Sequence, residues 1–247
     1  MDANYTRAYE EFEKKHWWHV ARGELIRWAI DHYVPDLDRA RWLDVGCGAG
    51  VLLEQYTRIS PERKLGLEMD GGCVEAARAK GLDVRQVGPQ WDFTAYGQFD
   101  LVTLCDVIEH VEDDFAAIEA VRAVLNTGGT ALITVPALMS LWSAHDVRNH
   151  HFRRYAKPDL VARFPKDRWK VQRLTYFSSF LLPMIWGFRT LKKLRYGTNP
   201  SVAADDKHYG PKAVDASLLA IFRIECLSLH TVSMPLGSSL LLVVRKV

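Results

Sequence analysis

Several features that mark particular protein classes are missing from this sequence. The net charge is only +2 over 247 residues, so the chain lacks the basic field of nucleic-acid-binding proteins, and no nucleic-acid partner is expected. Its four cysteines lie far apart without a C-x-x-C pair, which argues against a zinc site or a disulfide framework. No apolar run is long enough to span a bilayer, and the polar N-terminus begins no signal peptide. These absences predict a cytoplasmic protein.

The most informative stretch is LDVGCGAG at residues 43–50. An apolar run is followed by glycines at alternate positions and then by a helix start, which predicts strand, tight turn and helix. Glycine is needed where the backbone turns sharply and approaches a ligand at a point where any Cβ would clash. Amides at the start of the next helix can meet a negative group. This stretch therefore predicts the first unit of a nucleotide-binding sheet.

The glycine spacing separates two cofactor classes. A dinucleotide fingerprint reads G-x-G-x-x-G, whereas this chain has G-x-G-x-G, with Val51 in place of the last glycine. This spacing disfavours NAD. The string DVGCGAG closely resembles the first motif of class I S-adenosylmethionine-dependent methyltransferases. A tight turn without a ligand is the structural alternative.

Other segments extend the resemblance over nearly the whole chain. Gly66-Leu67-Glu68 matches the family's second motif, and Glu68 can accept hydrogen bonds from both ribose hydroxyls of an adenosine group. The FDLVTLCDVIEHV run at 99–111 and the LNTGG run at 125–129 also match. The chain departs from the family at Gly88-Pro89-Gln90, where many members carry an acid for the adenine amino group. Adenine contacts therefore stay open, with Asp92 as the nearest acid.

The hydrophobic patterning predicts one α/β domain with a doubly wound, seven-stranded, Rossmann-like sheet whose last strand is antiparallel. Strands are expected at residues 42–45, 64–70, 83–87, 99–105, 130–135, 169–176 and 239–246. Helices are expected within 5–34 and at 72–80, 113–125, 158–164, 177–194 and 214–228. Residues 1–40 would form an N-terminal helical lid, 41–136 the cofactor-binding core, and 137–247 the acceptor side, with a helical insertion between the last two strands.

The resemblance implies S-adenosylmethionine as cofactor and S-adenosylhomocysteine as product. An H-W-W-x-x-x-R run near the N-terminus resembles a group of bacterial small-molecule methyltransferases, and makes Arg22 a candidate partner for the cofactor's carboxylate. Ligands in doubly wound sheets bind outside the carboxyl ends of the strands. The predicted cofactor-binding residues are Trp18, Arg22, Asp44, Gly46, Cys47, Gly48, Gly50, Glu68, Met69, Cys105, Asp106 and His110.

Residues 142–155 predict a loop that binds the methyl acceptor. Polar groups of mixed charge beside aromatic residues are poor core material, although a solvated crossing loop is the alternative. A histidine is the side chain best suited to remove a proton near neutral pH. Candidate bases are His145, His150, His151 and His110, and candidate substrate-binding residues are His145, Arg153, Arg154, Tyr155 and Tyr176. No metal is expected, because the spacing of His145, Asp146 and His150 is irregular.

The apolar stretch 177–194 ends in basic residues and has two readings. It can roof the acceptor pocket, or it can lie in a membrane surface, so peripheral membrane association through 177–195 stays open. The sequence predicts methyl transfer to the oxygen or nitrogen of a small molecule that is aromatic, a sugar or lipid-linked. The rival functions are an NAD-dependent oxidoreductase and a non-catalytic cofactor-binding regulator. The oligomeric state is not readable.

Overall fold

One mixed sheet organises the computed structural model, which describes residues 10–197 and 211–247. The strand order is β3-β2-β1-β4-β5-β7-β6, and strand β7 pairs antiparallel with both of its neighbours. The strands are β1 (Trp42–Val45), β2 (Lys64–Glu68), β3 (Val84–Gln86), β4 (Phe99–Cys105), β5 (Leu125–Pro136), β6 (Trp169–Phe177) and β7 (Ser239–Lys246). This topology confirms the predicted fold class.

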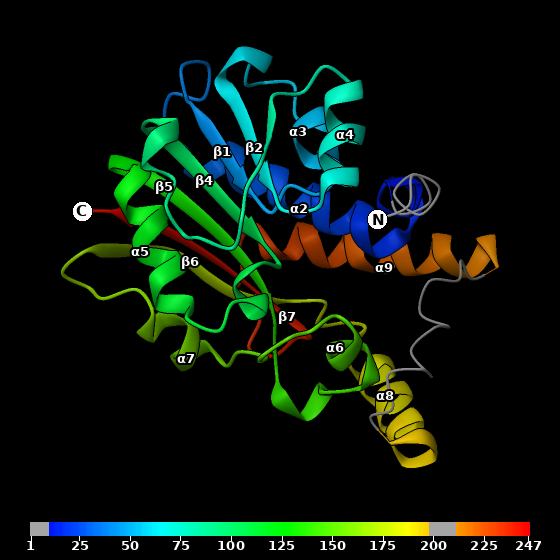
Figure 1. Cartoon of the computed structure of the whole chain (residues 1–247). Coiled ribbons are helices and arrows are strands. Elements are labelled where there is room, and N and C mark those ends of the chain that lie inside the picture. The colour runs from blue at the N-terminus through cyan, green and yellow to red at the C-terminus, as the bar shows by residue number, and fades with distance from the viewer. Residues whose placement is uncertain (1–9, 198–210) are drawn as a thin grey trace.

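Helices cover both faces of the sheet (Figure 1). On one face α2 and α9 lie side by side, and they share a core with α3, α4 and the sheet. On the other face α5 and α7 pack against the strands around Tyr155 and Phe164. The helices are α2 (Trp17–Tyr33), α3 (Val51–Gln55), α4 (Gly71–Ala79), α5 (Asp114–Val124), α6 (Ala144–Arg148), α7 (Lys157–Ala162), α8 (Leu182–Tyr196) and α9 (Lys212–Leu229).

Short 3-10 turns join several of these elements: η1 (Pro61–Arg63), η2 (Thr94–Tyr96), η3 (Ile108–His110) and η4 (Met139–Leu141). Two helices are capped at their N-termini by aspartate side chains. The side chain of Asp70 accepts from the amide of Cys73, and that of Asp113 accepts from the amide of Ala116. Each cap satisfies an amide that the first helical turn leaves without a partner.

Two segments begin five residues away from their predicted starts. Strand β5 begins at Leu125, because Leu125 already pairs with Phe99; the next paired residue is Thr130, and Gly128 between them takes a left-handed φ of +78°. Helix α8 begins five residues later than expected, because Phe177 completes β6 and Pro183 fits the first helical turn. The N-terminal helix is interrupted at His16, between helical residues 10–15 and α2. Expected helical residues 5–9, and most of the expected loop at 196–211, lie outside the described residues.

The sheet topology creates the place for a ligand. Strands β1 and β4 are neighbours, and from them the connections run in opposite directions, to β2 and to β5. Ligand-binding crevices form at such a switch point, outside the carboxyl ends of the parallel strands. The residues that follow β1, β2 and β4, and the last residue of β5, therefore meet at one edge of the sheet.

Candidate functional site

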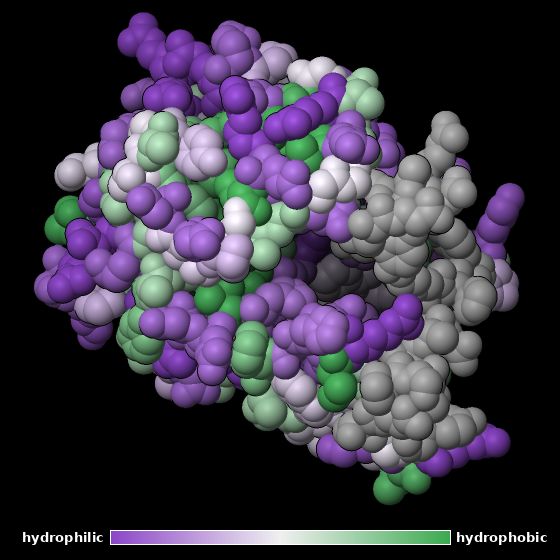
Figure 2. Space-filling model, viewed as in Figure 1, coloured by the Kyte–Doolittle hydropathy of each residue, from purple (hydrophilic) through white to green (hydrophobic). Residues whose placement is uncertain are grey.

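A cavity of about 950 Å³ opens at that edge of the sheet. Its lining combines the glycine loop after β1, the ends of β2 and β4, helix α2, helix α6 and one side of α8. The space-filling view shows a hollow near the middle of this face, bordered by hydrophilic side chains (Figure 2). A cavity of this size can enclose a cofactor and a small second reactant.

The glycine loop adopts the backbone that its composition predicts. Gly46 and Gly50 have φ values of +70° and +74°, in the left-handed region that favours glycine. A Cβ on Gly46 would lie 2.7 Å from Val107 Cγ2, and one on Gly50 would lie 2.5 Å from Leu82 Cδ1. Gly46 and Cys47 both donate their amides to the carbonyl of Leu67. The loop is thus held against β2, while Gly46, Cys47 and Gly48 line the cavity.

The carboxylate of Glu68 lies at the end of β2, as predicted, and lines the cavity. One oxygen accepts from the amide of Gly48 at 2.8 Å, and the other accepts from the amides of Met69 and Asp70 at 2.8 and 2.9 Å. A carboxylate offers about four acceptor positions. These three bonds orient the acid and leave acceptor capacity on the oxygen that faces Gly48. The side chain is part-buried, so this oxygen is accessible to a ligand.

Two further acids line the cavity, the buried Asp44 and the part-buried Glu13. Burial raises the pKa of Asp44 to about 7, although a hydrogen bond from the Thr103 hydroxyl at 2.5 Å opposes the shift. Burial also raises the pKa of Glu13 to about 7, and its Oε2 atom has no hydrogen-bond partner among the residues described. Both acids lie near Glu68, whose negative charge reinforces the two shifts. This end of the cavity therefore favours a positively charged ligand.

Arg22 is the cation closest to these acids. Its guanidinium forms an ion pair with Asp106 and lies 4.9 Å from the ring centre of Trp18. Asp106 has a φ of +59°, an uncommon backbone state for a residue other than glycine. Arg22, Asp106 and Trp18 all line the cavity, and the ion pair with Asp106 holds the guanidinium of Arg22 there.

Asp146 organises the other end of the cavity. Its buried carboxylate accepts from Arg154 Nε at 2.7 Å and from Arg189 at 3.3 Å, and it lies 3.0 Å from Nδ1 of His151. Burial alone would raise the pKa of Asp146, but the bond from His151 and the two guanidinium charges hold it well below its usual range. The ionised Asp146 can only accept, so Nδ1 of His151 carries a proton and Nε2 carries the free lone pair of the neutral ring.

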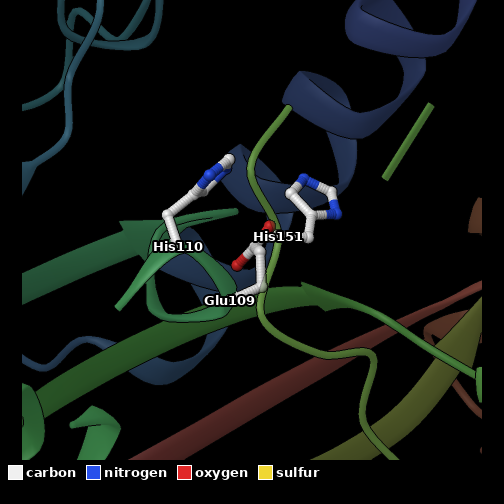
Figure 3. A group of neighbouring side chains, drawn as sticks. All are labelled: Glu109, His110 and His151. Atoms are coloured by element: carbon white, nitrogen blue, oxygen red, sulfur yellow. The ribbon is translucent and has the colours of Figure 1, made fainter. Parts of the chain in front are cut away.

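The 3-10 turn η3 places Glu109 and His110 beside His151 (Figure 3). The rings of His110 and His151 are 4.6 Å apart and nearly perpendicular. Burial raises the pKa of Glu109 to about 8 and lowers that of His110 to about 4. The amide of Phe152 donates to the carbonyl of Glu109 at 2.8 Å, which ties the acceptor loop to this turn.

The structure brings most of the predicted site residues to one cavity. Its lining includes Trp18, Arg22, Asp44, Gly46, Cys47, Gly48, Glu68, Cys105, Asp106, His110, His145, His151 and Arg154. Arg154 is 6% exposed, and its charge is already paired with Asp146. His145 is bonded to the side-chain amide of Asn149 at 2.9 Å. Among these histidines, His151 is oriented by the carboxylate of Asp146.

The other predicted residues lie away from the lining. Tyr155 is buried and donates to Asp114, which also pairs with Arg153, so both side chains anchor the loop on α5. Tyr176 is buried under Lys157, and His150 is exposed in a left-handed turn. Met69 is 57% exposed, and Gly50 packs against Leu82 instead of facing the cavity. Outside the cavity, Asp92 accepts from both the amide and the hydroxyl of Thr94.

Sequence reasoning missed Glu13, Glu109 and the role of Asp146. The environment of each acid is set by the segments that pack over it, and the local sequence does not show that packing. One signal was available for Glu109, since it stands between Ile108 and His110 in a turn that follows a buried strand. The N-terminal segment lines the cavity with Phe12, His16 and Trp17.

Comparisons with known proteins agree with this geometry. Residues 17–174 match a family described as "Methyltransferase domain". A ubiquinone biosynthesis O-methyltransferase from Xanthomonas oryzae pv. oryzae is 32% identical over 151 residues, which cover 53% of this chain and 63% of that protein. The protein of the same name from Acinetobacter baylyi is 29% identical over 138 residues, covering 52% and 56%. The chain therefore spans less than two thirds of the length of these relatives.

Solved structures share the fold at low identity. A chain from the complex between the Haloferax volcanii Trm112 methyltransferase activator and a methyltransferase has a TM-score of 0.61 at 16% identity, covering 98% of this chain and 95% of its own. An S-adenosylmethionine-dependent methyltransferase from Archaeoglobus fulgidus has a TM-score of 0.56 at 17% identity, covering 97% and 99%. These likenesses concern the fold alone.

Proposed function

The chain belongs to the methyltransferase-domain family, and from that premise we propose that it transfers a methyl group from S-adenosylmethionine to an oxygen of a small-molecule acceptor. The observation that carries the proposal is one continuous cavity whose lining includes both Glu68 and His151, with His151 oriented by the buried Asp146 behind it. The name of the curated relatives favours oxygen over nitrogen as the methylated atom. The product would be S-adenosylhomocysteine.

The residues at the first end fit the donor. Glu68 would accept from ribose hydroxyls, and Arg22 would meet the donor's carboxylate if it exchanged its ion pair with Asp106. Bound S-adenosylmethionine supplies a methyl group on a sulfonium, which is an activated leaving group. The unpartnered oxygen of Glu13 and the buried carboxyl of Asp44 suit a ligand with a net positive charge.

At the second end, His151 is the residue that we assign as general base. Asp146 fixes its tautomer and orientation, so that Nε2 can take the proton of an acceptor hydroxyl. Holding that oxygen in line with the methyl group supplies the rest of the rate. His145 and His110 lie in the same lining and are the alternatives, whereas His150 does not reach the cavity.

Helix α8 gives the cavity an apolar wall and favours an aromatic or lipid-linked acceptor. Met184, Ile185 and Phe188 line the cavity, while Trp186 and Leu194 lie on the outward side and are 55% and 80% exposed. Arg195 adds positive charge next to Leu194. We propose that this outward side rests on an anionic lipid surface, from which an acceptor can enter. Among the described helices, none is long and apolar enough to cross a bilayer.

The direct test uses S-adenosylmethionine labelled in its methyl group. The full chain is incubated with labelled donor and cell extract, and the lipid and aqueous fractions are analysed for a labelled small molecule. We expect one labelled product, and none with Glu68→Ala, which should lose donor affinity but keep its circular dichroism. Donor binding without transfer to any extract component would favour the non-catalytic alternative. Nicotinamide binding in place of donor binding would favour the oxidoreductase.

The choice of base has its own test. We expect His151→Gln to lower kcat about 10²- to 10⁴-fold, the usual contribution of general-base catalysis, with little change in donor affinity. His150→Gln is the matched control, because that side chain is exposed and outside the lining. Equal rates for the two variants would remove His151 from the mechanism.

A further inference from the structure

The carboxylate of Glu109 is a buried group without an explanation in the fold. The residue is 0% exposed, and neither side-chain oxygen has a hydrogen-bond partner among the residues described. Leaving a buried polar group unpaired is costly, and native structures usually satisfy it with protein, water or an ion. The residue also belongs to the lining of the cavity.

Two imidazoles surround this carboxylate (Figure 3). One ligand atom each from Glu109, His110 and His151 lies within 4.8 Å of the other two. Two nitrogens and one carboxylate oxygen form a ligand set that suits first-row divalent transition metals. We propose that Glu109, His110 and His151 bind one such ion, with Zn²⁺ as the type case.

The spacing is close to that of an occupied site. In a tetrahedral site, ligand atoms about 2.1 Å from the ion lie about 3.4 Å apart, so a closing movement of about 0.7 Å per side chain is enough. Both histidines come from short segments joined by the bond from Phe152 to Glu109, which keeps them together.

The surroundings of the two rings have the arrangement that metal-binding histidines use. Such a histidine usually donates its second nitrogen to a carboxylate or a carbonyl. His151 directs Nδ1 to the carboxylate of Asp146 at 3.0 Å, and the backbone of Asn149 lies beside the ring of His110 as an acceptor. The remaining nitrogen of each ring is then available as a ligand.

Three protein ligands leave coordination positions open toward the cavity. The role of the ion there rests on the proposed function, whereas the binding itself does not. An acceptor hydroxyl that joins the ion loses its proton to solvent more easily. Its oxygen then forms a bond to the methyl carbon while the bond from carbon to the sulfonium sulfur breaks, which leaves a neutral thioether. With the ion bound, His151 acts as a ligand, and the role of general base assigned to it above applies to the chain without the ion.

The test measures ion binding without turnover. The full chain, free of any histidine tag, is titrated with Co²⁺ while its visible absorption is followed, and with Zn²⁺ by calorimetry. We compare wild type with Glu109→Gln and His151→Gln. The control is His230→Gln, whose ring is exposed and stacks on Trp28 away from the cavity. Circular dichroism checks each variant, and His110→Gln replaces one that does not fold.

We expect one ion per chain, and at least tenfold weaker binding in the folded ligand variants but not in His230→Gln. Absence of stoichiometric binding, or equal affinity in all variants, overturns the proposal. Methyl transfer that persists in a chelator would leave the proposed function standing and remove the ion's role. Ion binding without methyl transfer would support the ion site and count against the proposed function. The failure of one proposal can therefore be distinguished from the failure of the other.

Discussion

Donor affinity should depend on pH through the buried acids of the cavity. The pKa of Asp44 and that of Glu13 are both raised to about 7, in each case chiefly by burial. A cationic donor favours their ionised forms, so binding lowers both pKa values and releases protons. The sign follows by linkage: affinity falls as the pH drops below 7 and levels off above it.

The size of the effect follows from the ionised fraction. A group with a pKa of about 7 is ionised to about 90% at pH 8 and about 10% at pH 6, so each required carboxylate changes the affinity up to about tenfold over that range. If both acids act, the upper limit is about a hundredfold. Arg22 lowers both pKa values and Lys80 lowers that of Glu13, while Glu68 raises both.

The assay is calorimetry at pH 6, 7 and 8 with wild type and Asp44→Asn. Histidines that line the cavity are present in both proteins, so the difference between the two profiles isolates the carboxyl of Asp44. We expect Asp44→Asn to bind the donor more weakly than wild type at pH 8. Between pH 6 and pH 8, the affinity of the variant should change about tenfold less than that of wild type. Thr103→Val removes the bond that lowers the pKa of Asp44, and should move the midpoint to higher pH. A flat wild-type profile, or parallel profiles, would refute this reasoning.

Three further outcomes test the packing and the surfaces. Gly66→Ala should destabilise the chain by about 1–3 kcal/mol in urea unfolding, because its Cβ would lie 2.6 Å from Cys47 Sγ. A Cβ on Gly187 in α8 would meet nothing within 4 Å, so Gly187→Ala should raise the free energy of unfolding by about 0.5–1 kcal/mol. Stabilisation by Gly66→Ala, or destabilisation by Gly187→Ala, would contradict the packing described. Trp186→Ala should lower co-sedimentation with phosphatidylglycerol vesicles about tenfold or more, through lost apolar burial. Val171→Ala on β6, a second exposed apolar position, should leave that binding unchanged, and equal losses would exclude a role for α8.

Much of the fold could be predicted because its signals are local. Strands β1, β4 and β7 have the predicted bounds, since each is an apolar run enclosed by turns. The resemblance to class I methyltransferases is confirmed by the family match over 17–174. Strand β5 was predicted to begin at Thr130 because Gly128 and Gly129 are typical of a turn. Gly128 does take a left-handed φ of +78°, but Leu125 ahead of it already pairs with Phe99.

The donor side of the site could also be predicted from the sequence, because the positions of the glycine loop and of Glu68 depend mainly on the strands that precede them. The acceptor side was not. In the sequence, Arg153 and Tyr155 resemble substrate-binding groups. In the structure, Asp114 on α5 forms an ion pair with Arg153 and accepts a hydrogen bond from the hydroxyl of Tyr155. Conversely, Glu109 looked ordinary, and only the packing of residues 137–155 over η3 makes it buried and unpaired.

The placement of acids also bears on product release. Methyl transfer removes the sulfonium charge, so S-adenosylhomocysteine has one positive charge fewer than the donor. Near neutral pH, Asp44 and Glu13 are partly ionised in the free chain, and they fully ionise only when a cation is beside them. After transfer they can take up protons again, which removes most of the attraction. The ratio of product Kd to donor Kd should therefore rise with pH between 6 and 8, and a ratio that is constant in calorimetry would show that these acids do not sense the sulfonium.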